Sequence, residues 1–311
     1  MDPGGAERRA SLAFLALLTG AVGIGFAPIF VRVAEVGPLA SAFWRMALAL
    51  PPLIFWRALQ TARARRHESR SERRPVCSRQ GSPIRGDLVL LVGCGLFFAA
   101  DLGLWHWSIR LTTVANATLL ANLNPVFVAL VGFLFLGHRF RPLFLLGMAS
   151  ALAGAAALMG ASLEVSPERL LGDALGIATA VMYAGYFLTT ARLRSRHDTW
   201  TVLSFSILVT ALALWPLALA SPEPMLPRDL VGWWPLIGLA LVSQIGGQGL
   251  IVHALAHLPP AFSAVSLLLQ PVVAALAAWA LFGEALGPLE GFGALLVLGG
   301  IVLARIATRV R

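Results

Sequence analysis

Residues 101–147 read DLGLWHWSIRLTTVANATLLANLNPVFVALVGFLFLGHRFRPLFLLG. This stretch holds a carboxylate deep inside an apolar run, Asp101, and a proline in the middle of a membrane-length segment, Pro125. It also recurs: when 115–154 is laid over 261–300, a shift of 146 residues without a gap, 12 of the 40 positions are identical. The identities include prolines and glycines, which apolar composition alone would not align. We interpret the match as an internal repeat, which any fold prediction has to explain first.

The composition is that of a membrane protein. Of the 311 residues, 58% are hydrophobic and 13% charged, whereas soluble domains carry about 25% charged residues. The net charge of +9 does not indicate nucleic-acid binding, because the basic residues lie in short loops between apolar runs. Cys77 lies in a basic loop and Cys94 in an apolar run, so we expect no disulfide. The N-terminal apolar run resembles a signal peptide but continues to about Val31, so we expect a retained membrane helix.

Ten apolar segments are long enough to cross a bilayer, which takes about 20 helical residues. In lipid the backbone must satisfy its own hydrogen bonds, so the sequence predicts an all-α polytopic membrane protein. The segments are 10–31, 39–57, 87–108, 113–135, 142–161, 172–191, 199–220, 231–253, 261–282 and 288–306. The connection 58–86 carries eight arginines between Arg63 and Arg85, and we expect it to be disordered.

The arginines set the expected orientation. With the N-terminus inside, 19 arginines lie on the inner side and four on the outer side, while Arg45 lies within a helix. The positive-inside rule therefore predicts that both termini are cytoplasmic.

Two repeats of five helices each, 1–161 and 162–311, must enter the membrane from opposite sides. The sequence thus predicts a 5+5 inverted repeat, an arrangement typical of secondary transporters with a substrate site near mid-membrane. A duplicated channel or scaffold is the alternative.

These features resemble the EamA-type carriers of the drug/metabolite transporter superfamily, from about Leu12 to Arg305. The resemblance rests on the ten helices and on LFLGHRFRPLFLLG (134–147) and ALFGEALGPLEGFG (280–293). The family usually has a Gly-Glu pair there, and Gly283-Glu284 fits, whereas His138 follows Gly137 in the first half. GFAPIFVRVAEVGPLASAFWR and DLGLWHWSI are similar to one bacterial branch, which implies the inner membrane.

The resemblance implies a carrier of small organic solutes driven by a proton gradient or by exchange, and no P-loop for ATP is present. We expect a small-molecule substrate and the lipid bilayer as partners, no nucleic acid, no cofactor and no metal, and a monomer or weak homodimer. A membrane-embedded enzyme and a sensor or scaffold are the alternatives. The enzyme is disfavoured because Asp101 and His106 lie about 140° apart on a helix.

Asp101 and Arg45 are the most costly residues for a membrane helix to bury. Counted from the outer helix ends, Arg45 lies about 9 Å and Asp101 about 10 Å deep, at 1.5 Å per residue. Equal depth on consecutive helices predicts an ion pair, direct or through water. The alternatives are that Asp101 is only structural and that Arg45 snorkels to the surface.

Prolines 28, 125 and 271 each interrupt a predicted helix and would free the carbonyl four residues earlier, at Ile24, Ala121 and Leu267. Such breaks are tolerated in membranes where the freed groups line a cavity or find partners. Amides accompany the breaks, and they either line a substrate site or join helices. The candidates are Asn116, Asn122, Asn124, Pro125, Gln270 and Pro271.

Further candidates are aromatic and amide side chains inside apolar segments. We expect an aromatic lining from Trp44, Trp105, Tyr183 and Tyr186, and Gln244 and Gln248 lie one turn apart opposite the Asp101 position of the repeat. Scattered histidines and distant cysteines give no metal-ligand cluster. Glycines 147, 154, 293 and 300 predict close helix packing without a substrate role.

Overall fold

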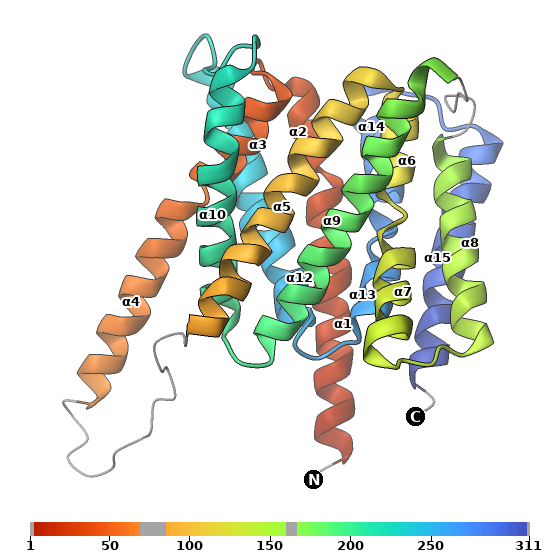
Figure 1. Ribbon diagram of the computed structural model, residues 1–311, viewed down its shortest axis with the longest axis horizontal. Coiled ribbons are helices and arrows are strands. Elements are labelled where there is room, and N and C mark those ends of the chain that lie inside the picture. Colours follow the sequence, from red (N-terminus) through yellow and green to blue (C-terminus); the bar gives the residue numbers. More distant parts are fainter. Residues whose placement is uncertain (1–2, 69–84, 160–166, 310–311) are drawn as a thin grey trace.

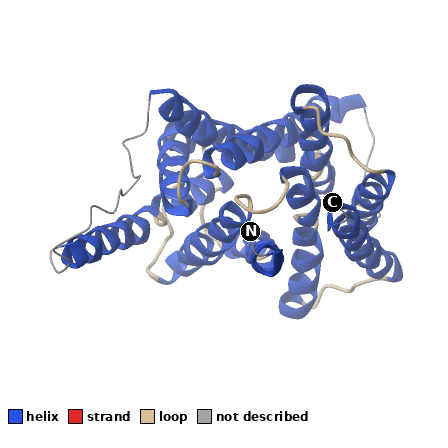
Figure 2. Cartoon of the chain, turned by 90° about the horizontal axis from the view of Figure 1, so that it is seen from below, coloured by secondary structure: helices blue, strands red, loops and turns tan. Residues whose placement is uncertain are grey.

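The computed structural model describes residues 3–68, 85–159 and 167–309. Within these ranges the chain forms helices and connecting loops without a strand (Figure 2). Ten helical stretches are long and apolar enough to span a membrane, so the protein is an all-α polytopic membrane protein. They are Glu7–Val33, Pro38–Ala62, Asp87–Leu111, Val114–Leu136, Pro142–Met159, Pro167–Arg194, Thr199–Ala220, Val231–Ala254, Pro260–Phe282 and Pro288–Thr308.

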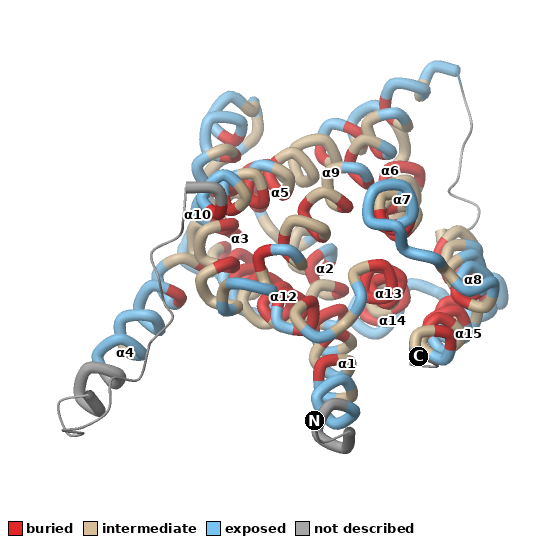
Figure 3. The backbone as a smooth tube through the Cα atoms, turned by 60° about the horizontal axis from the view of Figure 1, so that its bottom comes forward, coloured by how far each residue is buried: buried red, intermediate tan, exposed pale blue. Residues whose placement is uncertain are grey.

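Five spans of the first repeat contain eight helices. They are α1 (Pro3–Gly25), α2 (Ala27–Val33), α3 (Pro38–Ala47), α4 (Leu50–Glu68), α5 (Arg85–Leu111), α6 (Val114–Ala121), α7 (Asn124–Leu136) and α8 (Pro142–Met159). Residues 54–62 of α4 are mostly exposed (Figure 3). The expected disorder of 58–86 is therefore wrong for 58–68, which continue the helix of the second span, and 69–84 lie outside the described residues.

The second repeat begins with the short 3₁₀ helix η2 (Pro167–Arg169). It continues with α9 (Leu170–Arg194), α10 (Thr199–Ala220), η3 (Val231–Trp233), α11 (Trp234–Gly238), η4 (Leu239–Gln248), α12 (Gly249–Ala254), α13 (Pro260–Ser266), α14 (Leu269–Phe282) and α15 (Pro288–Arg309). The segment η4 is a π-helix, a rare geometry that often marks functional sites. Both ends of the chain lie at one side of the bundle (Figure 1), which we call the terminal face, and the other side is the opposite face.

The crossing of α8 and α15 reveals the symmetry of the two repeats. A methyl group built on Gly147 would lie 2.6 Å from the carbonyl oxygen of Gly300, and one on Gly154 would lie 2.5 Å from that of Gly293. The repeat register relates Gly147 to Gly293 and Gly154 to Gly300. Exchanging the two halves therefore turns one contact into the other, as an inverted repeat requires. The predicted packing role of these glycines is confirmed.

The three predicted helix breaks are present. α1 gives way to α2 before Pro28, α6 to α7 before Pro125, and α13 to α14 before Pro271. The carbonyl of Leu267 is not free as expected, because it accepts the backbone N–H of Gln270 at 2.9 Å. A tight turn thus gives the Leu267 carbonyl the hydrogen bond that Pro271, which has no N–H, cannot provide.

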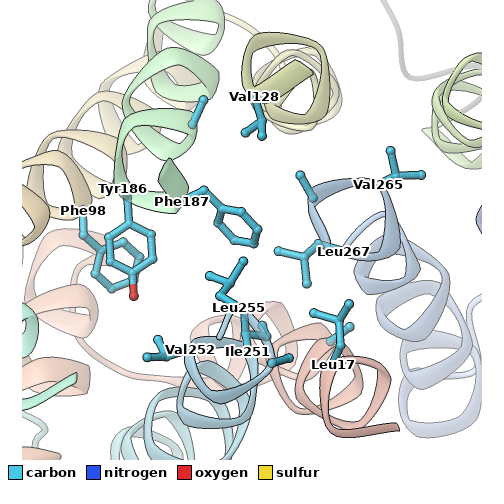
Figure 4. Packing of buried hydrophobic residues seen from close by; sticks show 14 of the residues in the cluster. Leu17, Phe98, Val128, Tyr186, Phe187, Ile251, Val252, Leu255, Val265 and Leu267 are labelled. Carbon is cyan, nitrogen blue, oxygen red and sulfur yellow. The ribbon is translucent and has the colours of Figure 1, made fainter. Parts of the chain in front are cut away.

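The largest buried cluster joins both repeats. Figure 4 shows Val128 of α7, Phe187 of α9, Leu255 after α12 and Leu17 of α1 pointing toward one another. Both α12 and α13 are largely buried (Figure 3). The core therefore lies on the interface between the halves, and it is this interface that positions the candidate site.

Candidate functional site

Arg45 connects the two repeats through a buried hydrogen bond. Its Nε donates to Oε1 of Gln244 at 2.8 Å, which links α3 to the π-helix η4. Arg45 is 9% exposed and Gln244 is fully buried. The Nε2 of Gln244 has no hydrogen-bond partner. The predicted snorkelling alternative is thereby excluded in this structure, because Arg45 is buried and bonded across the interface.

Asp101 lies near Arg45 without contacting it. The carboxylate interacts electrostatically with both Arg45 and Tyr183. Asp101 is half-buried, and within the described chain it forms no ion pair with Arg45 at or below 4.0 Å. Arg45 thus bonds to Gln244 instead of pairing directly with Asp101, and a pair through water stays a prediction.

Aromatic rings form a stack beside these groups. Tyr186 is fully buried, and its ring lies 4.6 Å from that of Phe98 and 6.0 Å from that of Tyr183, measured between centroids (Figure 4). The Tyr186 hydroxyl accepts a hydrogen bond of 2.9 Å from Nε2 of Gln248. Sequence reasoning missed Phe98, although it lies three residues before Asp101 on the same helix, a spacing at which side chains are neighbours.

Amide groups at the helix breaks lack partners. Asn124 is 3% exposed, and its Nδ2 has no hydrogen-bond partner. Gln270 approaches the Tyr183 hydroxyl, but its Nε2 also lacks a hydrogen bond of normal geometry. Pro125 is buried next to Asn124, whereas Pro271 and Asn122 are half-buried. With Gln244, three buried amide donors from both repeats are left unsatisfied.

Three predicted site residues have partners elsewhere. Trp44 Nε1 donates to the carbonyl of Met225 at 2.8 Å, and its ring packs 4.8 Å from that of Trp233 near the opposite face. Asn116 Nδ2 donates to Asp173 Oδ1 at 3.3 Å. The ring of Trp105 packs edge-on against the neighbouring ring of His106. None of these three contacts involves Arg45, Asp101 or Gln244.

A charged contact closes the opposite face. Arg32, in the last turn of α2, pairs with Glu284 directly after α14, and its guanidinium lies 4.3 Å from the ring centroid of Phe282. Gly283 ends α14 with φ 68°, a left-handed conformation that favours glycine. We call Arg32, Phe282 and Glu284 the clasp.

At the terminal face, the residues that correspond to the clasp by position make other contacts. The repeat register places His138 where Glu284 stands, and the ring of His138 lies against Phe140. The arginines at the end of α9 bond elsewhere: Arg194 Nε donates to the carbonyl of Val252 at 3.1 Å, and Arg196 pairs with Asp87 at 2.9 Å. The two faces are therefore fastened differently in this structure.

Comparisons with known proteins agree with this architecture. The model of the EamA-like transporter family matches residues 11–160 and 170–306. A pseudopaline exporter of Pseudomonas aeruginosa is 28% identical over 73% of this chain and 77% of its own length. The threonine/homoserine exporter of Escherichia coli is 27% identical over 68% and 70%, and a probable amino-acid metabolite efflux pump of Salmonella typhimurium is 26% identical over 96% of both chains.

One crystal structure covers 97% of this chain and 99% of its own, with a TM-score of 0.75 and 22% sequence identity. That likeness concerns the fold alone. The family model accounts for both repeats, and the relatives are transporters of small solutes rather than enzymes. The chain belongs to the EamA-like transporter family.

Proposed function

We propose that the chain is a secondary carrier that exports a small organic solute with a carboxylate group through a cavity between its two repeats, 1–161 and 162–311. Relatives named as exporters of amino acids and metabolites support both the direction and the solute class. The observation that carries the solute chemistry is the buried Arg45–Gln244 hydrogen bond, which leaves Nε2 of Gln244 unpaired.

A buried donor without a partner costs about 1–3 kcal/mol, so three such amides require an explanation. The unpaired nitrogens belong to Asn124, Gln244 and Gln270, and they come from both repeats. A carboxylate accepts several hydrogen bonds at once. A bound carboxylate would therefore satisfy these donors together, with Arg45 supplying the positive charge.

Asp101 would supply the opposite charge in the same region. A half-buried carboxylate without a direct ion pair can bind either a proton or the ammonium group of an amino acid. We propose that Asp101 couples transport to a proton gradient or to exchange of the solute.

Alternating access would require the clasp to open. In this structure Arg32 and Glu284 hold α2 and the end of α14 together at the opposite face. Exposed ion pairs contribute only about 0–1 kcal/mol, so such a contact can break during every transport cycle. We propose that the bilayer is a bacterial inner membrane and that the terminal face is cytoplasmic.

Proteoliposomes loaded with a radiolabelled amino-acid mixture would test the proposal. Vesicles with wild-type protein should release label faster than loaded vesicles without protein, whereas vesicles with Arg45→Gln should lose most of this release. Trp44→Phe is the control on the same helix, because the contacts of Trp44 with Met225 and Trp233 lie near the opposite face. Equal release by wild type and Arg45→Gln would contradict the proposed site, and no release of any solute by folded wild type would contradict the carrier.

A further inference from the structure

A cavity lies on the outside of the bundle. It has a volume of about 570 Å³ and lies between α3, α5 and α10. Seven residues of α5 line it: Leu96, Ala99, Ala100, Gly103, Leu104, Trp107 and Arg110. Leu96 is 50% and Trp107 is 52% exposed, so the cavity opens outward, where the bilayer surrounds a membrane-spanning bundle. We call it the α5–α10 groove.

The α5–α10 groove is separate from the Arg45 group. Successive residues of an α-helix turn by about 100°, so Gly103 and Asp101 lie about 160° apart on α5. Asp101 therefore faces away from Gly103, and of the α5 lining only Leu104 lies close to it around the helix, about 60° away. None of the residues proposed for the solute site lines the groove, so the groove is a separate candidate site.

The lining changes its chemistry along the groove. From Leu96 to Gly103 the α5 lining is apolar, and Leu217 of α10 completes this part. Trp107 and Arg110 follow toward the opposite face. Leu96 and Arg110 are 14 residues apart, which corresponds to about 21 Å at 1.5 Å per residue. The groove thus combines a long apolar part with one cationic end at the level where tryptophan and arginine meet lipid headgroups.

The middle and the cationic end of the groove have room for an occupant. A methyl group on Gly103 would touch only Leu217 Cδ1, at 3.8 Å, so this glycine leaves space that a larger side chain would fill. Arg110 pairs with Glu223, and the side chains of both remain partly exposed, at 40% and 31%. An external anion can therefore approach the guanidinium, in competition with the Glu223 carboxylate.

We propose that the α5–α10 groove binds one phospholipid, with an acyl chain along α5 past Gly103 and the phosphate at Arg110. The apolar part, from Leu96 to Gly103 with Leu217, disfavours a polar solute because these side chains offer no hydrogen-bond partner. The cationic end distinguishes this site from an ordinary lipid-facing surface, since it fixes the headgroup of the same molecule. The bound lipid would fill the space between α5 and α10.

Photo-crosslinking would test the site in nanodiscs of phosphatidylethanolamine and phosphatidylglycerol that contain a phosphatidylglycerol with a diazirine in its acyl chain. Mass spectrometry should find labelling concentrated on α5 and α10 around Gly103 and Leu217. Gly103→Leu should remove this labelling. Gly93→Leu is the matched control, because it is the same change in the same helix, outside the lining and in open space.

The headgroup contact has its own pair of variants. One cation near a membrane surface contributes about 1 kcal/mol, so Arg110→Gln should weaken retention of the phospholipid about fivefold in native mass spectrometry. Glu223→Gln should strengthen it, because it removes the competing carboxylate. Even labelling of all lipid-facing helices, including exposed Phe133 and Phe135 of α7, would overturn the proposal. Unchanged retention in both Arg110→Gln and Glu223→Gln would also overturn it. These two variants keep the test valid if Gly103→Leu does not fold.

Discussion

Gln244 and Gln248 lie one turn apart in η4, yet their hydrogen bonds differ in kind. Gln244 accepts from the charged Arg45, whereas Gln248 donates to the neutral Tyr186 hydroxyl. Hydrogen bonds to charged groups contribute about 1.5–3 kcal/mol, compared with about 0.5–1.5 kcal/mol for neutral ones. Gln244→Leu should therefore lower the melting temperature of the purified protein more than Gln248→Leu does. An equal or smaller loss in Gln244→Leu would show that Arg45 does not depend on this bond.

Asp101 is the residue at which a structural and a mechanistic role can be separated. Because it makes no direct ion pair with Arg45 and is half-buried, Asp101→Asn should leave the free energy of unfolding within about 1 kcal/mol of wild type. It should abolish solute accumulation driven by a pH gradient in proteoliposomes, while solute exchange continues. If the Asp101→Asn protein unfolds readily, the role of Asp101 is structural. If its pH-driven accumulation equals that of wild type, Asp101 does not couple transport to protons.

At this scale the sequence identifies the important residues better than their partners. Arg45, Asp101, Gln244 and Gln248 could be found because polar groups in apolar runs are costly and few. Their contacts could not, because the rotation of each helix about its axis depends on packing against distant segments. For the same reason Trp44, which looks like a cavity residue, bonds instead to a loop carbonyl at Met225.

Neighbouring glycines in α15 test the packing of single elements. Gly300 meets the backbone of α8, where a methyl group would lie 2.5 Å from the carbonyl oxygen of Gly147, whereas one on Gly299 would meet nothing within 4 Å. Overpacking costs about 1–3 kcal/mol. Gly300→Ala should therefore reduce the yield and melting temperature measured by fluorescence-detected size-exclusion chromatography.

Gly299→Ala is the control for the same substitution one position earlier. Alanine is favoured over glycine in a helix by about 1 kcal/mol, so this variant should be as stable as wild type or more stable. If both variants behaved alike, the α8–α15 crossing would not have the close approach described above.

Element boundaries followed from the sequence where apolar runs and prolines mark them. All ten spans and the breaks at Pro28, Pro125 and Pro271 could be predicted. The π-helical geometry of η4 could not, because nothing in its composition separates it from an α-helix. The continuation of α4 to Glu68 was also missed, since its polar composition indicated disorder.

For the whole molecule, the internal repeat was the decisive sequence signal, and the reciprocal glycine contacts of α8 and α15 agree with it. The orientation in the membrane rests on arginine placement. Reporter fusions at Arg73 and after Arg311 should both read cytoplasmic, because most arginines lie in the connections on that side. A periplasmic reading at either position would contradict the assigned orientation.

The central claim is that polar residues from both repeats line one solute site at the helix breaks. Single cysteines at Asn124 and Gln270, in a background with Cys77 and Cys94 replaced, would be exposed to a charged thiol reagent in proteoliposomes. Phe135→Cys is the control, because it lies on α7 with Asn124 but is 78% exposed on the outside of the bundle, where lipid surrounds it.

The account predicts that both site cysteines react, that a transported solute slows both reactions, and that the cysteine at 135 stays inert. If the cysteines at 124 and 270 stay as unreactive as the control in every condition, the amides only join helices and the shared solute site does not exist.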